Sequence, residues 1–244
     1  MKRLNAITDP KGFGTSIQAG PHDVDSWVFV AYDQLNLSLI ETIEQAIGTV
    51  GLMFIESAFK GRSRPYHKQK LALLLSNQRH FALEAQEAGY AVDYLVTQGT
   101  YAEALTVLAN EVGPIHCVEF AEYSTRIELQ PLIESAALVV HPHNGWLTPR
   151  SWFTETVGTA PPFRMDRFYR RVRKETGWLM VDAQPVGDKY SFDEENRKPW
   201  RGDPAAPAPP MFTVDDIDVG VKKLVENVYS DHPGSIDFTQ IPTS

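Results

Sequence analysis

The sequence is poor in cysteine, in long apolar runs and in positive charge. Its 244 residues include one cysteine, Cys117, which excludes an intrachain disulfide and a four-cysteine iron–sulfur site. Because Cys117 lies in the apolar run 115–118, we expect a reduced core thiol. No segment approaches the roughly 18 apolar residues of a membrane helix, and residues 1–26 lack the apolar stretch of a signal peptide. These absences predict a cytoplasmic protein without a membrane partner.

The net charge and the positions of the glycines argue against two further classes of function, general nucleic-acid binding and nucleotide binding. The formal net charge of −8 argues against a general nucleic-acid binder, so contact with DNA requires a local basic patch. Residues 32–36, after the first apolar strand, lack the glycines that let a backbone approach a pyrophosphate, and no Walker loop is present. A nucleotide site that cradles phosphates is therefore disfavoured.

The composition is that of a globular protein, 43% hydrophobic and 22% charged, in which apolar strands alternate with amphipathic helices. The longest helix is expected after Pro65 and ends at Gly89. Connections between parallel strands are nearly always right-handed. The pattern therefore predicts an α/β fold with a doubly wound, five-stranded parallel sheet. Its strands are expected at residues 27–32, 50–55, 91–96, 115–120 and 137–141.

The sequence divides into four predicted parts. Residues 1–26 are expected to be a flexible arm, residues 27–145 the α/β domain, and residues 146–199 a helical and loop extension of that domain. Residues 200–244 contain a proline-rich connector, followed by a short helix that Thr213 is expected to cap. This extended and helical tail is too short to be a domain.

Polar side chains follow the predicted strands at the edge where α/β sheets bind ligands. They are Asp33 and Gln34 after the first strand, Glu56 after the second, residues 119–122 around the fourth and residues 141–144 after the fifth. Carboxylates and amides suit a polar heterocycle with a hydroxylated tail. The alternative is that Asp33 and Glu56 cap the helices that follow them.

Three histidines lie near the fourth and fifth predicted strands. His116, His141 and His143 have no carboxylate or cysteine at metal-ligand spacing. We therefore predict no metal site, and no residue is assigned a catalytic role.

A series of motifs gives a more specific indication. They are Asp33-Gln34-Leu35, Glu56, residues 66–71 and 79–81, the basic segment 164–170, and residues 177–180, 184–187 and 190–199. In this order they resemble the amino-terminal antenna domain of photolyase-related proteins in the cryptochrome/photolyase family, in the bacterial iron–sulfur (6-4) photolyase branch. The resemblance covers roughly residues 27–215. Tyr32 stands where the family has glycine, and Tyr66 replaces the first of two histidines.

The resemblance implies a light-harvesting chromophore, 6,7-dimethyl-8-ribityllumazine, at the carboxyl edge of the sheet. By this analogy its binding residues are Asp33, Gln34, Leu35, Glu56, His67 and Glu119. In the family a second, helical half carries FAD and an iron–sulfur cluster and repairs DNA. Neither group is expected on this chain, and the isolated chain is predicted to be inactive as a lyase. The bulky Tyr32 is the departure best placed to fill the chromophore pocket.

A concentrated basic patch occupies a predicted helix. It consists of Arg164, Arg167, Arg170, Arg171, Arg173 and Lys174, of which Arg164, Arg167, Arg171 and Lys174 share one helix face. A solvated helix face and a contact with phosphates are both compatible with this pattern. In the resembling family the neighbouring region joins the two halves and lies near DNA, so the patch suits either DNA or a partner half.

Three functions therefore stay open. The chain is the chromophore-binding part of a photolyase-like DNA repair protein that works with a separate flavin-binding half, or a free-standing small-molecule binding module without photochemistry. The third alternative is an interaction protein that uses the former interdomain surface. For a surface of this kind we expect an exposed apolar patch at Trp178, Leu179, Met180 and Phe192.

Overall fold

The computed structural model describes Phe13 and residues 24–193 and 199–243, so most of the predicted arm lies outside the described residues. The chain forms two compact units. The sheet unit contains the residues up to Asn144 and those from Pro209 onward, and the helical unit contains Gly145–Ala208. The segment predicted as an extension of the α/β domain is therefore a unit of its own. No helix in the described parts is long and apolar enough to cross a membrane.

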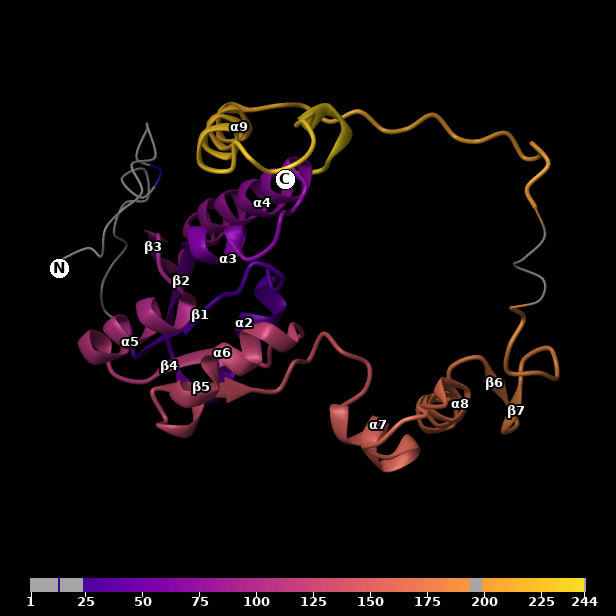
Figure 1. Ribbon diagram of the computed structural model, residues 1–244. Coiled ribbons are helices and arrows are strands. Elements are labelled where there is room, and N and C mark those ends of the chain that lie inside the picture. Colours follow the sequence, from indigo (N-terminus) through magenta and orange to yellow (C-terminus); the bar gives the residue numbers. More distant parts are fainter. Residues whose placement is uncertain (1–12, 14–23, 194–198, 244) are drawn as a thin grey trace. The chain divides into compact units, whose positions relative to one another are not determined.

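A five-stranded, all-parallel sheet forms the centre of the sheet unit (Figure 1). The spatial order is β3-β2-β1-β4-β5, which confirms the predicted doubly wound α/β fold. All eight residues of β2 are buried, because this strand has neighbours on both sides and helices over both faces. The strands are β1 (Ser26–Phe29), β2 (Val50–Ser57), β3 (Ala91–Thr97), β4 (Ile115–Val118) and β5 (Leu138–His141).

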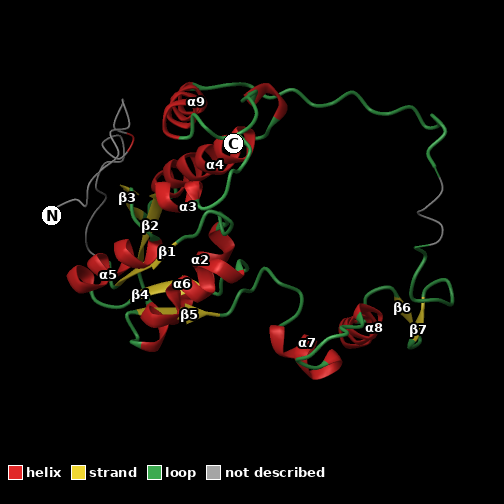
Figure 2. Cartoon of the chain, viewed as in Figure 1, coloured by secondary structure: helices red, strands yellow, loops and turns green. Residues whose placement is uncertain are grey.

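Helices cover both faces of the sheet (Figure 2). One layer contains α2 (Leu37–Ile47) and α4 (Lys68–Glu87), and the other contains α5 (Tyr101–Val112) and α6 (Tyr123–Glu134). Successive side chains of a strand point to opposite faces, so each strand supplies both layers. Val28, Leu52 and Phe54 pack with the first layer, and Phe29, Met53, Ile55 and the free thiol of Cys117 pack with the second.

Two local features differ from the expected pattern. A short helix, α3 (Ala58–Arg62), directly follows β2, and Ser57 caps it by accepting a hydrogen bond from the Lys60 backbone N–H at 3.0 Å. The helix α6 (Tyr123–Glu134) contains a proline, Pro131, in its interior. Pro131 lies beyond the first turn of α6, which ends three residues later.

The tail returns to the sheet unit, where α9 (Asp216–Val228) lies against α4 (Figure 1). The cap of α9 is Asp215, so the prediction of Thr213 was wrong. Asp215 accepts from the backbone N–H of Asp218 at 2.9 Å, and the Asp218 carboxylate accepts from that of Asp215 at 3.4 Å. The His80 ring of α4 bonds Asp215 at 2.7 Å, and Ser76 donates to Asp218. These contacts attach the start of α9 to α4.

The helical unit contains α7 (Arg150–Val157), α8 (Met165–Thr176) and a short hairpin of β6 (Met180–Val181) and β7 (Gln184–Pro185). Its most buried charged group is Arg173, whose guanidinium donates to the backbone carbonyls of Leu179 and Tyr190. Arg173 therefore connects α8 to the hairpin and the segment after it.

The attachment of α9 can be tested with two valines of the same helix. Val221 is fully buried between α9 and α4, whereas Val219 is 41% exposed. We expect Val221→Ala to lower the free energy of unfolding by about 1.5 to 3 kcal/mol, because methyl groups are lost and a cavity is left. Val219→Ala should leave it unchanged or raise it slightly, because alanine is the better helix former. Urea titrations followed by circular dichroism measure both, and equal effects would contradict this packing.

Candidate functional site

A buried ion pair lies at the carboxyl end of β2. Glu56 and Arg79 are 5% and 2% exposed. Arg79 of α4 donates from Nε to Glu56 Oε1 at 2.6 Å and from Nη2 to Oε2 at 3.0 Å. Tyr94 of β3 donates its hydroxyl to Oε1 at 2.5 Å. Burial and the Glu56 carboxylate raise the pKa of Tyr94 well above its ordinary value, so its hydroxyl stays protonated and continues to donate.

The sequence left open that Glu56 only caps the helix that follows it. That alternative was wrong, since Ser57 is the N-cap of α3. A carboxylate offers about four acceptor positions. Three of those on Glu56 are already occupied by Arg79 and Tyr94. Glu56 still lines a cavity, but little of its acceptor capacity is left for a ligand.

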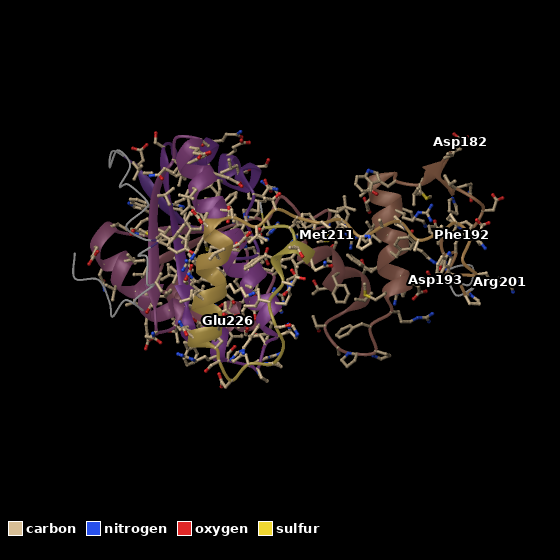
Figure 3. All side chains as sticks on the ribbon, turned by 90° about the horizontal axis from the view of Figure 1, so that it is seen from above. Asp182, Phe192, Asp193, Arg201, Met211 and Glu226 are labelled. Atoms are coloured by element: carbon tan, nitrogen blue, oxygen red, sulfur yellow. The ribbon has the colours of Figure 1, made fainter. Side chains whose placement is uncertain are left out.

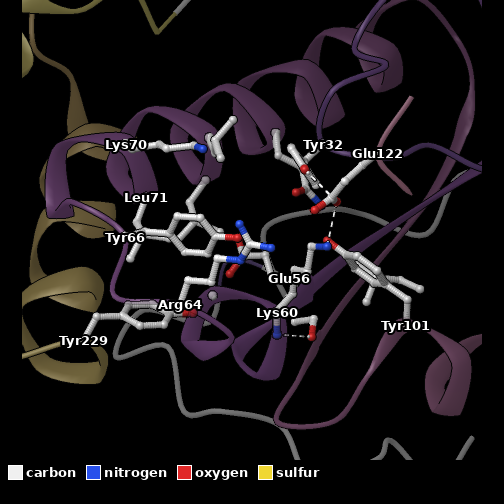
Figure 4. Close-up of a pocket in the computed structure, with 16 residues that line it drawn as sticks. Tyr32, Glu56, Lys60, Arg64, Tyr66, Lys70, Leu71, Tyr101, Glu122 and Tyr229 are labelled. Carbon is white, nitrogen blue, oxygen red and sulfur yellow. Dashed lines mark hydrogen bonds and ion pairs between the residues drawn. The ribbon is translucent and has the colours of Figure 1, made fainter. Parts of the chain in front are cut away.

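A cavity of about 320 Å³ opens beside Glu56, inside the sheet unit (Figure 4). Its walls include the end of β2, α3, one face of α4, Arg64, Tyr66 and Tyr229. Figure 4 shows Tyr66 on one side and Tyr101 on the other. This is the edge at which open α/β sheets bind ligands, and the volume is at the small end of ligand pockets.

A hydrogen-bonded cluster around Glu122 borders the cavity. Lys60 Nζ lies 2.6 Å from Glu122 Oε2, and the hydroxyls of Tyr32 and Thr125 donate to the same oxygen at 3.0 and 2.7 Å. Burial alone would raise the pKa of Glu122, but the hydrogen bonds from Lys60, Ser124 and Thr125 outweigh it and hold the pKa at about 2. Tyr32, which stands where the resembling family has glycine, thus lines the cavity and is held there by Glu122.

Gln78 of α4 is the unusual polar residue of the cavity wall. Its side chain is 2% exposed, and its Nε2 has no hydrogen-bond partner in the part of the chain that the structure describes. A buried donor without a partner costs about 1 to 3 kcal/mol. An acceptor atom of a ligand in the cavity would remove this cost.

Of the six residues predicted to bind a chromophore, Glu56 lines the cavity, and Asp33, Gln34, Leu35, His67 and Glu119 do not. Gln34 donates to the backbone carbonyls of Val118 and Glu119, and so connects the ends of β1 and β4. Leu35 packs against the core, and His67 is the N-cap of α4. Asp33 is not the cap of α2 either, because Asn36 has that role. A part in ligand binding for these five stays a prediction.

Most residues of the cavity wall were not selected from the sequence. Tyr101 begins α5 and Tyr229 follows α9, so neither belongs to a strand end. Lys60 lies in the short helix α3, which had no clear sequence signal. Gln78 is the exception, because a polar residue among the apolar residues on one face of the long helix indicates a special role.

The predicted basic patch lies on α8 in the helical unit, where several of its residues have protein partners. Arg171 donates to Thr156 and to Glu155 of α7, at 3.0 and 2.8 Å. Arg164 lies 3.5 Å from Asp166, and the Arg170 guanidinium lies over the Tyr190 ring. Arg167 and Lys174 are exposed and form no ion pair with the described residues. Contact with DNA or with a partner half through α8 stays a prediction.

The apolar residues expected at a former interface are largely exposed within the helical unit. Trp178 and Leu179, at the turn after α8, are 63% and 64% exposed. Phe192 is 40% exposed in the loop after β7 (Figure 3), whereas Met180 is partly buried in the hairpin. These side chains are not core residues of their unit.

Comparison with known proteins gives two matches. The family described as "Deoxyribodipyrimidine photo-lyase-related protein" matches residues 28–240. A "(6-4) photolyase" from Agrobacterium fabrum (strain C58 / ATCC 33970) is 29% identical over 223 residues, which cover 86% of this chain. The aligned part is 43% of that protein, so the chain spans less than half the length of this relative.

The Glu56–Arg79 pair predicts a large effect on stability. Glu56→Gln should lower the free energy of unfolding by about 3 to 5 kcal/mol, because it removes the buried negative charge that faces the Arg79 guanidinium. Glu119→Gln is the matched control and should change it by less than about 0.5 kcal/mol. The Glu119 side chain forms no hydrogen bond or ion pair with the residues that the structure describes. Denaturant titration of both variants checks this, and similar stabilities would argue against a structural role for the pair.

The lowered pKa of Glu122 predicts how stability depends on pH. Its folded pKa of about 2 lies below the ordinary value of 4.5, so its contribution is complete above pH 4.5 and is lost as the pH falls to about 2. Wild type and Glu122→Gln should differ in unfolding free energy at pH 6, and the difference should disappear near pH 2. A difference that is independent of pH would show that the charge of Glu122 is not responsible.

Proposed function

Because the chain belongs to the family of deoxyribodipyrimidine photo-lyase-related proteins, we propose that it is the light-harvesting part of such a DNA repair protein. In this proposal the cavity beside Glu56 binds a ribityl-substituted heterocycle, namely 6,7-dimethyl-8-ribityllumazine. Absorbed energy is then passed to a flavin in a separate half, to which we assign the FAD, the iron–sulfur cluster and the repair chemistry.

The observation that carries the proposal is the unpartnered amide of Gln78 in the cavity wall. A lumazine ring has carbonyl oxygens and ring nitrogens that accept hydrogen bonds, so it supplies the acceptor that Gln78 Nε2 lacks. Tyr66, Tyr101 and Tyr229 line the same cavity and provide aromatic contacts for a flat ring. A ribityl tail carries hydroxyls that suit polar groups at the cavity edge, such as Lys60 and Glu122.

Glu56 has only a limited role as a ligand contact in this proposal. Its carboxylate is occupied by Arg79 and Tyr94, so we assign it mainly to holding the cavity wall in place. One acceptor position on the carboxylate remains for a ligand N–H or O–H group. Gln78 is therefore the better residue for testing binding, because it has no competing partner in the described structure.

Gln78→Met should have opposite effects on binding and on stability. The change keeps the length of the side chain but removes the buried donor, so the free protein should become more stable by about 1 kcal/mol. Affinity for 6,7-dimethyl-8-ribityllumazine should fall about tenfold, because one hydrogen bond to the ligand is lost. Fluorescence titration gives the affinity, and thermal melting gives the stability.

Gln45→Met provides the control, since Gln45 lies on the exposed face of α2 and does not line the cavity. It should change neither quantity appreciably. If the wild type does not bind the lumazine, the proposed function is wrong. If Gln78→Met binds as well as the wild type, the ligand does not use this amide.

A further inference from the structure

The cavity has more positive charge than its own carboxylates require. Lys60, Arg64 and Lys70 all line it, together with the carboxylates of Glu56 and Glu122. Glu56 is paired with Arg79, and Glu122 with Lys60. Each carboxylate therefore already has its own cation, and the charges of Arg64 and Lys70 remain.

Arg64 and Lys70 form no ion pair with the residues that the structure describes. The Lys70 ammonium lies 4.9 Å from the centre of the Tyr66 ring, and Arg64 precedes that tyrosine by two residues. Figure 4 shows Arg64, Tyr66 and Lys70 on the same side of the cavity, opposite Tyr101 and Glu122. Two cations beside an aromatic ring are thus concentrated at one side of the cavity.

This local excess contrasts with the chain as a whole, whose formal net charge is −8. Two like charges at one cavity edge repel each other, and no carboxylate in the described structure forms an ion pair with either of them. An anionic group of a ligand would do so. Gln78, whose buried Nε2 has no partner among the described residues, lines the same cavity and independently favours a ligand with an acceptor atom.

We propose that the cavity selects an anionic ligand, a ribityl heterocycle that carries a phosphate ester on its tail, and that Arg64 and Lys70 bind the phosphate. This inference rests on the proposed function and adds the charge of the ligand to it. Arg64 offers a planar fork of donors, and Lys70 a mobile point charge, which are two common ways of binding phosphate through side chains. A glycine-rich loop, which the sequence lacks, is not required for this kind of recognition.

The test compares two ligands that differ in one group. The full chain is titrated with 6,7-dimethyl-8-ribityllumazine and with its 5′-phosphate, and binding is followed by ligand fluorescence. The phosphate ester should bind about tenfold more tightly at low ionic strength, because it adds charge-assisted hydrogen bonds. High salt should reduce this preference, since both cations are exposed to solvent. Inorganic phosphate should compete with the ester but not with the neutral lumazine.

Variants assign the preference to residues. In the double variant Arg64→Gln, Lys70→Gln the two ligands should bind with equal affinity. Lys223→Gln is the control, because Lys223 is exposed on α9 and does not line this cavity; it should keep the wild-type preference. Circular dichroism melts verify that the variants are folded.

The outcomes separate the two proposals. Equal affinity of the wild type for both ligands, or tighter binding of the neutral one, would overturn the charge selection and leave the proposed function intact. A preference that persists in the double variant would overturn the roles of Arg64 and Lys70. If neither ligand binds, both the selection and the proposed function fail.

Discussion

The cavity depends on the buried ion pair between Glu56 and Arg79. It joins the carboxyl end of β2 to the middle of α4, and Tyr94 adds a contact from β3. Separating a buried ion pair is costly, so α4 cannot turn about its axis without losing the bonds between Arg79 and Glu56. The same helix carries Lys70 and Gln78 toward the cavity. One electrostatic constraint therefore fixes the orientation of the wall on which the proposed ligand contacts lie.

Much of the fold could be predicted from the sequence, because apolar runs and helical periodicity report burial directly. Residues 50–57 are apolar almost throughout and form the fully buried β2. The predictions that failed concern local details, where neighbouring residues fit the same role or a helix is very short. Thr213 and Asp215 both suit a helix cap, and the reciprocal bonds with Asp218 decide for Asp215. The helix α3 is too short for a periodic pattern to form, and its cap, Ser57, lies inside an apolar strand.

The candidate site was predictable only in its location. The topology rule indicates the carboxyl edge of the sheet, where the cavity lies, but it does not say which polar groups line that cavity. Gln34 resembles a ligand-binding amide in sequence, yet its Nε2 donates to two backbone carbonyls of the neighbouring strand end. Glu56 is neutralised by Arg79, a helix residue whose sequence position says nothing of this contact. Side-chain pairing between distant segments decided these roles, and a single sequence does not record it.

The return of the tail to the sheet unit has a consequence for the order of events during synthesis. The cavity wall includes Tyr32 near the start of the sheet unit and Tyr229 after α9. A ribosome must therefore translate the helical unit between Asn144 and Pro209, and α9 after it, before Tyr229 emerges. The nascent sheet can form its core earlier, but the cavity is completed only after α9 has packed on α4. The cavity wall is thus closed later than the core of the sheet, because its last residue lies after the helical unit in the sequence.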